Sequence, residues 1–194
     1  MRFTRGLNRV PKTPKYIEIE FEEGVPVKLD GRRKKLVALI ESLNDIAGRY
    51  GVGRFDMIEN RLVGIKSREV YEAPGAHVLL IAHGELENMV MDREFVHYKR
   101  LLSEKYAELV YYGLWFSPLK DALDGFFKSN QKRVTGKVRI KLDRGQASCV
   151  GRKSALSLYS KGLATYSEGD LFDRNMAEGF MKIWGLPYEG IKKI

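Results

Sequence analysis

The sequence has 194 residues, enough for one sizeable domain with an arm or for two small domains at most. A hydrophobic content of 44% and an aromatic content of 11% exclude an intrinsically disordered chain. No uninterrupted apolar run, Val78 to Ala82 included, is long enough to span a membrane. The single cysteine, Cys149, excludes an internal disulfide and a cysteine-based zinc site, so a reducing cytoplasm is the natural compartment.

Positive charge is concentrated near the amino terminus. The net charge is +9, and residues 1–15 carry five basic side chains and no acidic one. From residue 16 onward acids and bases are interleaved, which favours affinity for small anions over a nucleic-acid-binding surface. Pro11 and Pro14 predict an extended conformation, because proline fixes its own φ and biases the preceding residue away from helix. We expect residues 1–15 to be a basic linker remnant whose other domain is absent.

The first regular elements expected are a β-hairpin and a helix. Residues 16–21 and 25–29 alternate between apolar and polar side chains around a Glu-Glu-Gly turn, which is the pattern of paired strands. A helix follows from apolar residues at helical spacing, and Gly51 is suited to its end. These apolar residues are Leu36, Leu39, Ile40, Leu43, Ile46 and Ala47.

The stretch from Gly51 to Pro74 fits neither the helical nor the strand spacing of apolar residues. It mixes charges of both signs with apolar residues, and neither one helical face nor a simple alternation accounts for its whole length. Its glycines allow tight turns of the backbone. From the residues alone, this stretch is either a solvated edge or a wall that faces a substrate.

Three helices are expected next. Pro74 suits the first position of a buried helix over residues 75–90, and Asp92 can cap a second helix over about 93–112. The Ser117-Pro118 pair begins a third helix, with the cap and the first-turn proline in the right order.

The chain closes with a second hairpin and a further helix. Alternation over residues 134–142 and a return at 147–151 predict antiparallel strands with one solvated face. From Asp170 onward, Phe172, Met176, Phe180 and Ile183 suggest a short amphipathic helix, and apolar groups on such an arm usually need another surface, often a second subunit. The expected fold is α+β: an antiparallel sheet and hairpins packed with several helices, with a C-terminal helical arm for oligomerisation.

Few residues offer a reaction centre. The sequence lacks a Walker-type phosphate loop, and the lone Gly51-Val-Gly53 indicates only a turn. Cys149 is expected to be a small buried side chain in a strand, and His83 a core histidine on an apolar helix. No feature places a base beside the serines of residues 154–160, so a serine hydrolase is disfavoured.

Several segments resemble one enzyme family. They are GRYGVGRFDMIENRLVGIKSREVYEAPG, FEEGVPVKLDG at 21–31, AELVYYGLWFSPL at 107–119, and VTGKVRIKL with GRKSALSLY at 134–142 and 151–159. Together they resemble the C-terminal synthetase and multimerisation domain of argininosuccinate synthase, the archaeal-type members most. The resemblance covers about residues 16–187, and the ENR, KSR and YExP elements in this order are specific to the family.

The resemblance implies an activity and a missing half. Members of the family join citrulline and aspartate in arginine biosynthesis and the urea cycle. ATP, with Mg²⁺, adenylates the ureido oxygen of citrulline, and the aspartate amine then displaces AMP. The nucleotide domain with its SGGxDS-type loop has no counterpart here, so this chain alone is expected to bind neither ATP nor Mg²⁺ and to be inactive. Residues 16–169 would be the citrulline-side synthetase domain of a cytoplasmic homotetramer, and residues 170–194 its oligomerisation arm.

Two substrate contacts of the family map onto this sequence. Glu59 of ENR and Tyr71 of YExP match citrulline-binding positions. A carboxylate can accept a charge-assisted hydrogen bond from the citrulline ammonium, and a tyrosine hydroxyl can donate to an oxygen. A straight strand of this length would separate the two residues by roughly 40 Å. The chain is therefore expected to fold back between them, at Asn60-Arg61 and at Gly64.

Neighbouring charges allow other roles. Arg61, Lys66 and Arg68 are expected to support the wall or to approach the nucleotide domain. Glu59 could instead form an ion pair with Arg61 or Arg68. Glu69 stands where many members have glycine.

Two other interpretations of the whole chain remain open. One is a basic scaffold or nucleic-acid-binding module that kept the fold without the chemistry, and its only positive sign is the basic leader. The other is a truncated gene product with no independent role.

Overall fold

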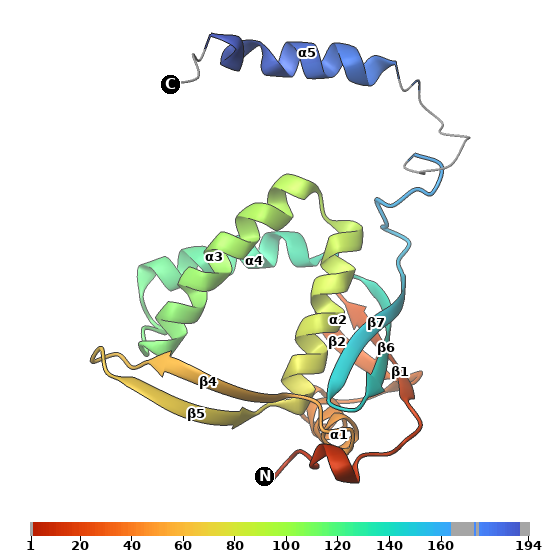
Figure 1. Ribbon diagram of the computed structural model, residues 1–194, viewed down its shortest axis with the longest axis vertical. Coiled ribbons are helices and arrows are strands. Elements are labelled where there is room, and N and C mark those ends of the chain that lie inside the picture. Colours follow the sequence, from red (N-terminus) through yellow and green to blue (C-terminus); the bar gives the residue numbers. More distant parts are fainter. Residues whose placement is uncertain (1, 164–172, 174, 191–194) are drawn as a thin grey trace. The chain divides into compact units, whose positions relative to one another are not determined.

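The computed structural model describes residues 2–163, 173 and 175–190 (Figure 1). The chain divides into two compact units, one from Met1 to Leu158 and one from Tyr159 to Ile194. In the described part of the chain, the first unit combines two antiparallel sheets with four α-helices, and the second contains one α-helix. The expected α+β class is confirmed.

The larger sheet forms the centre of the first unit. Its strands lie in the order β3-β2-β1-β6-β7, and each neighbouring pair is antiparallel. The strands are β1 (Lys15–Glu22), β2 (Val25–Leu29), β3 (Arg32–Arg33), β6 (Gly136–Asp143) and β7 (Gln146–Lys153). Both predicted hairpins of this sheet are confirmed, and β1 joins them by pairing with β6 so that Ile17 lies opposite Ile140.

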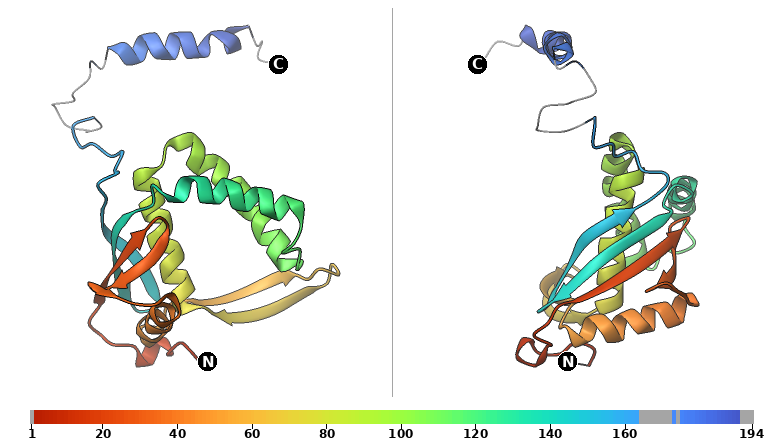
Figure 2. Two further views of the ribbon diagram at one scale, coloured as in Figure 1. Left: turned by 180° about the vertical axis from the view of Figure 1, so that it is seen from behind. Right: turned by 90° about the vertical axis from the view of Figure 1, so that its right-hand side faces the viewer.

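Two helices, α1 (Leu36–Arg49) and α2 (Pro74–Val90), pack against this sheet (Figure 2). The core between them contains Ile17, Ile19 and Phe21 of β1, Val138, Ile140 and Leu142 of β6, Leu39 and Leu43 of α1, and Val78, Ala82, Leu86 and Val90 of α2. Burying a large apolar side chain stabilises the fold by about 1.5–3 kcal/mol relative to leaving it exposed. Several other side chains of this sheet carry charge, as in the ion pairs of Glu20 with Lys28 and Lys137.

The next two helices, α3 (Arg93–Tyr111) and α4 (Pro118–Gln131), form a helical hairpin (Figure 1). Asp92 caps α3 and Ser117 caps α4, as predicted, each accepting a hydrogen bond from the backbone N–H three residues further on, at 3.0 and 3.3 Å. Aromatic side chains join the two helices: the ring of Phe95 in α3 stacks on that of Phe126 in α4 at a centroid distance of 5.2 Å.

The stretch from Gly51 to Pro74 contains a second antiparallel sheet, which has two strands. β4 (Arg54–Asn60) and β5 (Lys66–Glu72) project as a ribbon from the N-terminal end of α2 (Figures 1 and 2). The backbone N–H of Arg61 donates to the Ile65 carbonyl at 2.9 Å and closes the turn. Gly64 there has φ of 81°, the left-handed region that favours glycine.

In the second unit, α5 spans Met176–Glu189. The predicted start of this helix, at Asp170 and Phe172, lies outside the described residues. The helix extends past Trp184 and includes Pro187, which is further than expected. No helix of the described residues is long and apolar enough to cross a lipid bilayer.

Candidate substrate-binding site

The β4–β5 hairpin has two faces of different composition. Residues opposite each other in the ladder share a face, so Phe55 lies with Tyr71 and Glu59 lies with Ser67. Alternate residues of a strand point the same way, and these four side chains therefore lie on one face. We call this surface the Glu59 face.

Glu59 and Tyr71 are in direct contact. The Tyr71 hydroxyl donates a hydrogen bond to Glu59 Oε2 at 2.7 Å, although twelve positions separate the residues in the chain. The expected fold-back is thus observed, with its turn where it was predicted. Donation to the Glu59 carboxylate is the main reason that the pKa of Tyr71 is raised above 10.0, so the hydroxyl stays protonated at neutral pH. The Tyr71 side chain remains 44% exposed and accessible to a ligand.

Arg61 organises the turn end of the Glu59 face. Its Nη2 donates to Glu69 Oε1 at 3.0 Å, and its Nε donates to Ser67 Oγ at 3.1 Å. Ser67 Oγ in turn lies 3.5 Å from Glu59 Oε1. A connected row of polar groups therefore leads from Arg61 through Ser67 to Glu59 and Tyr71.

The ion-pair interpretation of Glu59 is wrong. Arg61 pairs with Glu69, and Arg68 pairs with Asp56, so neither arginine neutralises Glu59. Sequence reasoning also missed that Glu69 lies on the Glu59 face, where its negative charge helps to raise the pKa of Tyr71. The sequence did contain a signal for this placement. Glu69 lies two positions before Tyr71, and residues two apart in a strand point to the same face.

Lys66 and Arg68 lie on the opposite face of the hairpin. Lys66 Nζ donates to Asn60 Oδ1 at 2.6 Å, and Arg68 donates to both carboxylate oxygens of Asp56 at 2.8 and 2.5 Å. The hydrogen bond from Arg68 is the main cause that lowers the pKa of Asp56. Both contacts join β4 to β5 from behind the Glu59 face.

The base of the hairpin holds the amino-terminal segment. Glu72 accepts hydrogen bonds from the Thr4 hydroxyl and from the backbone N–H groups of residues 2–4, the latter at 2.7–3.2 Å. These bonds, the Thr4 hydroxyl first, hold the pKa of Glu72 at about 2. Opposite Glu72 in the ladder, Arg54 donates to Thr4 Oγ1 at 2.7 Å and to the Arg5 carbonyl at 3.1 Å. We call these contacts the clasp; sequence reasoning did not foresee them.

A hollow of about 700 Å³ lies at the tip of the hairpin. Asn60 of β4 lines it together with Glu104, Glu108 and Tyr111 of α3. Tyr111 is also near enough to Tyr71 to contribute to its raised pKa. The volume is that of a small-molecule pocket, and the hollow lies beside the end of β4 that carries Asn60.

The described residues do not fit a metal centre. In residues 2–163, 173 and 175–190, no three or more His, Cys, Asp or Glu side chains are grouped so that they could hold a metal ion. The sequence also contains no SGGxDS-type loop for nucleotide phosphates. What the arrangement offers is recognition of a small polar molecule by a carboxylate and a tyrosine hydroxyl.

Comparison with known proteins identifies the family. The family model for the arginosuccinate synthase C-terminal domain matches residues 1–191. The chain is 58% identical over 184 residues to the argininosuccinate synthase of Synechococcus sp. (strain JA-2-3B'a(2-13)) and 57% identical over 184 residues to that of Bacillus licheniformis, which covers 95% of this chain and 46% of each relative. It is 60% identical over 175 residues to that of Dictyoglomus turgidum, covering 90% of this chain and 44% of the relative. The chain thus spans about half the length of these relatives, and it belongs to the argininosuccinate synthase family, as its C-terminal domain.

Proposed function

We propose that this domain forms the citrulline-facing part of an argininosuccinate synthase. In that reaction ATP activates citrulline as citrullyl-AMP with release of pyrophosphate, and the aspartate amine then displaces AMP to form the new carbon–nitrogen bond. Family membership supports the reaction class. The observation that carries the proposed site is the 2.7 Å hydrogen bond between Tyr71 and Glu59, which brings together the two side chains that match citrulline-binding positions.

The pair suits the charged amino-acid end of citrulline. Glu59 Oε2 accepts from Tyr71, whereas Oε1 has only the long 3.5 Å contact with Ser67 Oγ and can accept a hydrogen bond from an ammonium group. The ammonium then shares the Glu59 charge, and the Tyr71 hydroxyl can turn to donate to the carboxylate of the ligand. A hydrogen bond to a charged group contributes about 1.5–3 kcal/mol, so two such contacts fix the orientation of a small ligand.

The supporting charges then have separate tasks. Arg61 orients Ser67 and Glu69 on the Glu59 face through its two hydrogen bonds. Lys66 and Arg68 bind the strands together from the opposite face, which stiffens the ribbon that presents Glu59.

We assign the nucleotide chemistry to the half of the relatives that this chain does not match. ATP and Mg²⁺ would bind there, and that half would face the exposed hairpin from the other side of the substrate. The isolated chain is then inactive. Support comes from its coverage of 46% of the Synechococcus relative and from the absence of a phosphate-binding loop in its sequence.

The C-terminal helix supports assembly into a homotetramer. Exposed apolar side chains of α5 are Met176, Phe180, Met181, Ile183, Trp184 and Leu186. A helix of this length is marginal in water by itself, so burial of these side chains against another copy would stabilise it. We place the assembled enzyme in the cytoplasm, where the lone thiol of Cys149 stays reduced.

A fusion with the N-terminal half of a relative tests the citrulline site. The N-terminal half of the Synechococcus argininosuccinate synthase is joined to this chain, and argininosuccinate formation is measured over a range of citrulline and aspartate concentrations. Glu59→Gln keeps the shape of the side chain and removes its charge. We expect the KM for citrulline to rise about tenfold or more, with little change in the KM for aspartate.

The matched control is Glu41→Gln, which removes the same charge from an exposed position on α1. It should leave both KM values unchanged. Wild-type kinetics in the folded Glu59→Gln fusion would remove Glu59 from the citrulline site. Formation of argininosuccinate by this chain without its fused partner would overturn the division of labour between the halves.

A further inference from the structure

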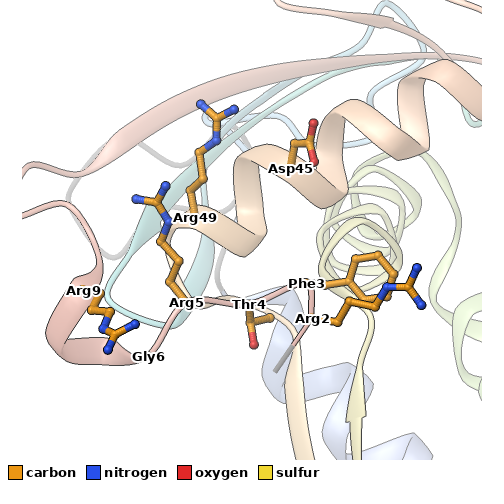
Figure 3. Close-up of a pocket in the computed structure, with 8 residues that line it drawn as sticks. All are labelled: Arg2, Phe3, Thr4, Arg5, Gly6, Arg9, Asp45 and Arg49. Carbon is orange, nitrogen blue, oxygen red and sulfur yellow. The ribbon is translucent and has the colours of Figure 1, made fainter.

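A second hollow lies at the opposite end of the hairpin, between the amino-terminal segment and α1 (Figure 3). It has a volume of about 640 Å³ and is lined by residues 2–6 together with Arg9, Asp45 and Arg49. Four of the lining side chains are arginines, and only Asp45 is acidic. The lining therefore carries an excess of positive charge.

A smaller hollow of about 350 Å³ shares two of these arginines. Arg5 and Arg49 line both hollows, and Lys15 adds a further positive charge to the smaller one. Figure 3 shows the side chains of Arg5 and Arg49 projecting in the same direction, one from the amino-terminal segment and one from α1. The two arginines therefore stand where the hollows meet.

The guanidinium groups of this basic hollow are available to a ligand. Within the described ranges, Arg5, Arg9 and Arg49 form no side-chain hydrogen bond or ion pair, and all three are exposed. Arg2 is the exception, since its guanidinium lies over the Phe3 ring at 5.8 Å. Unpaired positive groups around a concave surface raise the local potential and concentrate anions there.

The backbone that carries Arg5 is fixed in place. The clasp holds residues 2–4 at Glu72, and the Arg5 N–H donates to the Gly48 carbonyl at 2.9 Å. The two segments approach so closely that a Cβ at position 48 would lie 2.1 Å from the Phe3 carbonyl oxygen. A ligand therefore orders only the arginine side chains and not the segment itself, which lowers the entropic cost of binding.

One feature of α1 opposes an anion at this place. The helix ends at Arg49, and the C-terminal end of a helix carries about half a negative charge. The Ala47 and Gly48 carbonyls are already occupied by backbone N–H groups, which reduces their exposure to a ligand. The four arginines and Asp45 that line the hollow carry a net charge of +3, which opposes the half charge of the helix end.

We propose that the basic hollow binds a polyphosphate group, with Arg5 and Arg49 as its main contacts. Guanidinium forks donate paired hydrogen bonds to phosphate oxygens, and two arginines that line the same hollow can each bind one phosphate of a di- or triphosphate chain. The volume admits such a chain either as a free ion or as part of a nucleotide. Duplex nucleic acid fits less well, because its backbone needs a long basic stripe and these arginines surround a hollow. The site is separate from the Glu59 face and does not depend on the function proposed for it.

Calorimetric titration of the whole chain tests the site, with tripolyphosphate, metal-free ATP and sulfate as probes at one ionic strength. Arg5→Gln/Arg49→Gln removes the two main contacts while the backbone bonds of the clasp remain. We expect about tenfold weaker tripolyphosphate binding for each arginine removed, and about a hundredfold for both. The matched control, Arg32→Gln/Arg100→Gln, removes two exposed arginines from other elements and should weaken binding by less than about threefold.

The probes separate the sources of the phosphate chain. Equal affinity for ATP and tripolyphosphate supports recognition of the chain alone, and markedly tighter ATP binding supports a nucleotide as the ligand. Sulfate binding as tight as tripolyphosphate would overturn the proposal, as would equal losses in the test and control variants. A duplex DNA titration completes the set: binding that is lost in Arg5→Gln/Arg49→Gln, together with no binding of tripolyphosphate, would replace the proposal with a nucleic-acid contact.

Discussion

The Tyr71 hydroxyl can report on the state of Glu59. It donates to a carboxylate at 2.7 Å, and this contact is the main cause of its raised pKa. A ligand ammonium that shares the Glu59 charge would weaken the hydrogen bond between Tyr71 and Glu59. The Tyr71 hydroxyl could then donate to another acceptor. In the proposed citrulline site, the two side chains would therefore act together, because the hydrogen bond of the Tyr71 hydroxyl depends on the charge of Glu59.

Removal of this hydroxyl should weaken citrulline binding. In the fused enzyme, we expect Tyr71→Phe to lower citrulline affinity about tenfold at neutral pH, because one hydrogen bond to a charged group is lost. The hydroxyl can donate only while it is protonated, so its contribution is lost as pH rises through the raised pKa of Tyr71, and variant and wild type should converge at alkaline pH. Calorimetric titration with citrulline at several pH values measures this.

Tyr98→Phe provides the comparison for that experiment. Tyr98 is an exposed tyrosine of α3 whose ring contacts Phe126 at a centroid distance of 5.9 Å. Loss of its hydroxyl should leave citrulline affinity unchanged. Equal affinity in Tyr71→Phe and wild type at neutral pH would show that the Tyr71 hydroxyl does not contact the ligand.

The family resemblance points to Glu59 and Tyr71 as a candidate pair from the sequence alone, but it does not point to their neighbours. The place of Glu69 depends on strand register, which pairs it with Met57. Register is set by the turn and by what each face buries, and motif spacing contains neither quantity. For the same reason the partners of Arg61 and Arg68 follow only from the pairing of the two strands.

At the scale of elements, burial decides which strands the sequence reveals. Alternation over residues 134–142 is clear because β6 buries Val138, Ile140 and Leu142 on one side. The β4–β5 ribbon has no comparable buried face, since Met57, Ile58, Val70 and Tyr71 are all exposed. Charges and apolar groups are therefore distributed without a strand period, and the ribbon could not be recognised from the sequence.

The clasp should make the stability of the first unit depend on pH. Because the pKa of Glu72 is lowered from 4.5 to about 2, its contribution is complete above 4.5 and is lost as pH falls toward 2. We expect Glu72→Gln to lower the free energy of unfolding by about 1 kcal/mol at pH 7, since charge-assisted hydrogen bonds become neutral ones. The difference from wild type should shrink steadily in acid. Urea unfolding between pH 7 and pH 2.5 measures both effects.

Glu41→Gln again serves as the control, because it removes an exposed carboxylate of α1 that lies outside the clasp. Its unfolding free energy should follow that of the wild type at each pH. A Glu72→Gln penalty that stays constant down to pH 2.5 would mean that the charge of Glu72 does not hold the amino-terminal segment. Sequence reasoning could not find this contact, since residues 2–4 and Glu72 lie almost 70 positions apart.

At the scale of the whole chain, exposed aromatic side chains gather in the connection between two helices. Phe116, in the connection between α3 and α4, is 97% exposed, and Trp115 beside it is 49% exposed. Contiguous exposed aromatic groups of this kind usually mark contact surfaces.

The apolar stripe of α5 gives the sharpest test of assembly. Phe180 and Trp184 lie one helical turn apart, and their rings stack at a centroid distance of 5.5 Å. Placing two carboxylates here, in Phe180→Glu/Trp184→Glu, would force charge into any interface that buries the stripe. We expect the wild-type chain to sediment as an oligomer and the variant as a monomer at the same concentration.

Lys182→Gln is the control. The wild-type Lys182 side chain pairs with Glu178 at 2.7 Å, so this variant changes the charge of the same helix outside the stripe and should leave the mass unchanged. A variant that keeps the wild-type mass would exclude α5 as the interface, because a buried pair of unpaired carboxylates costs more than the remaining apolar contacts of so short a helix can offset.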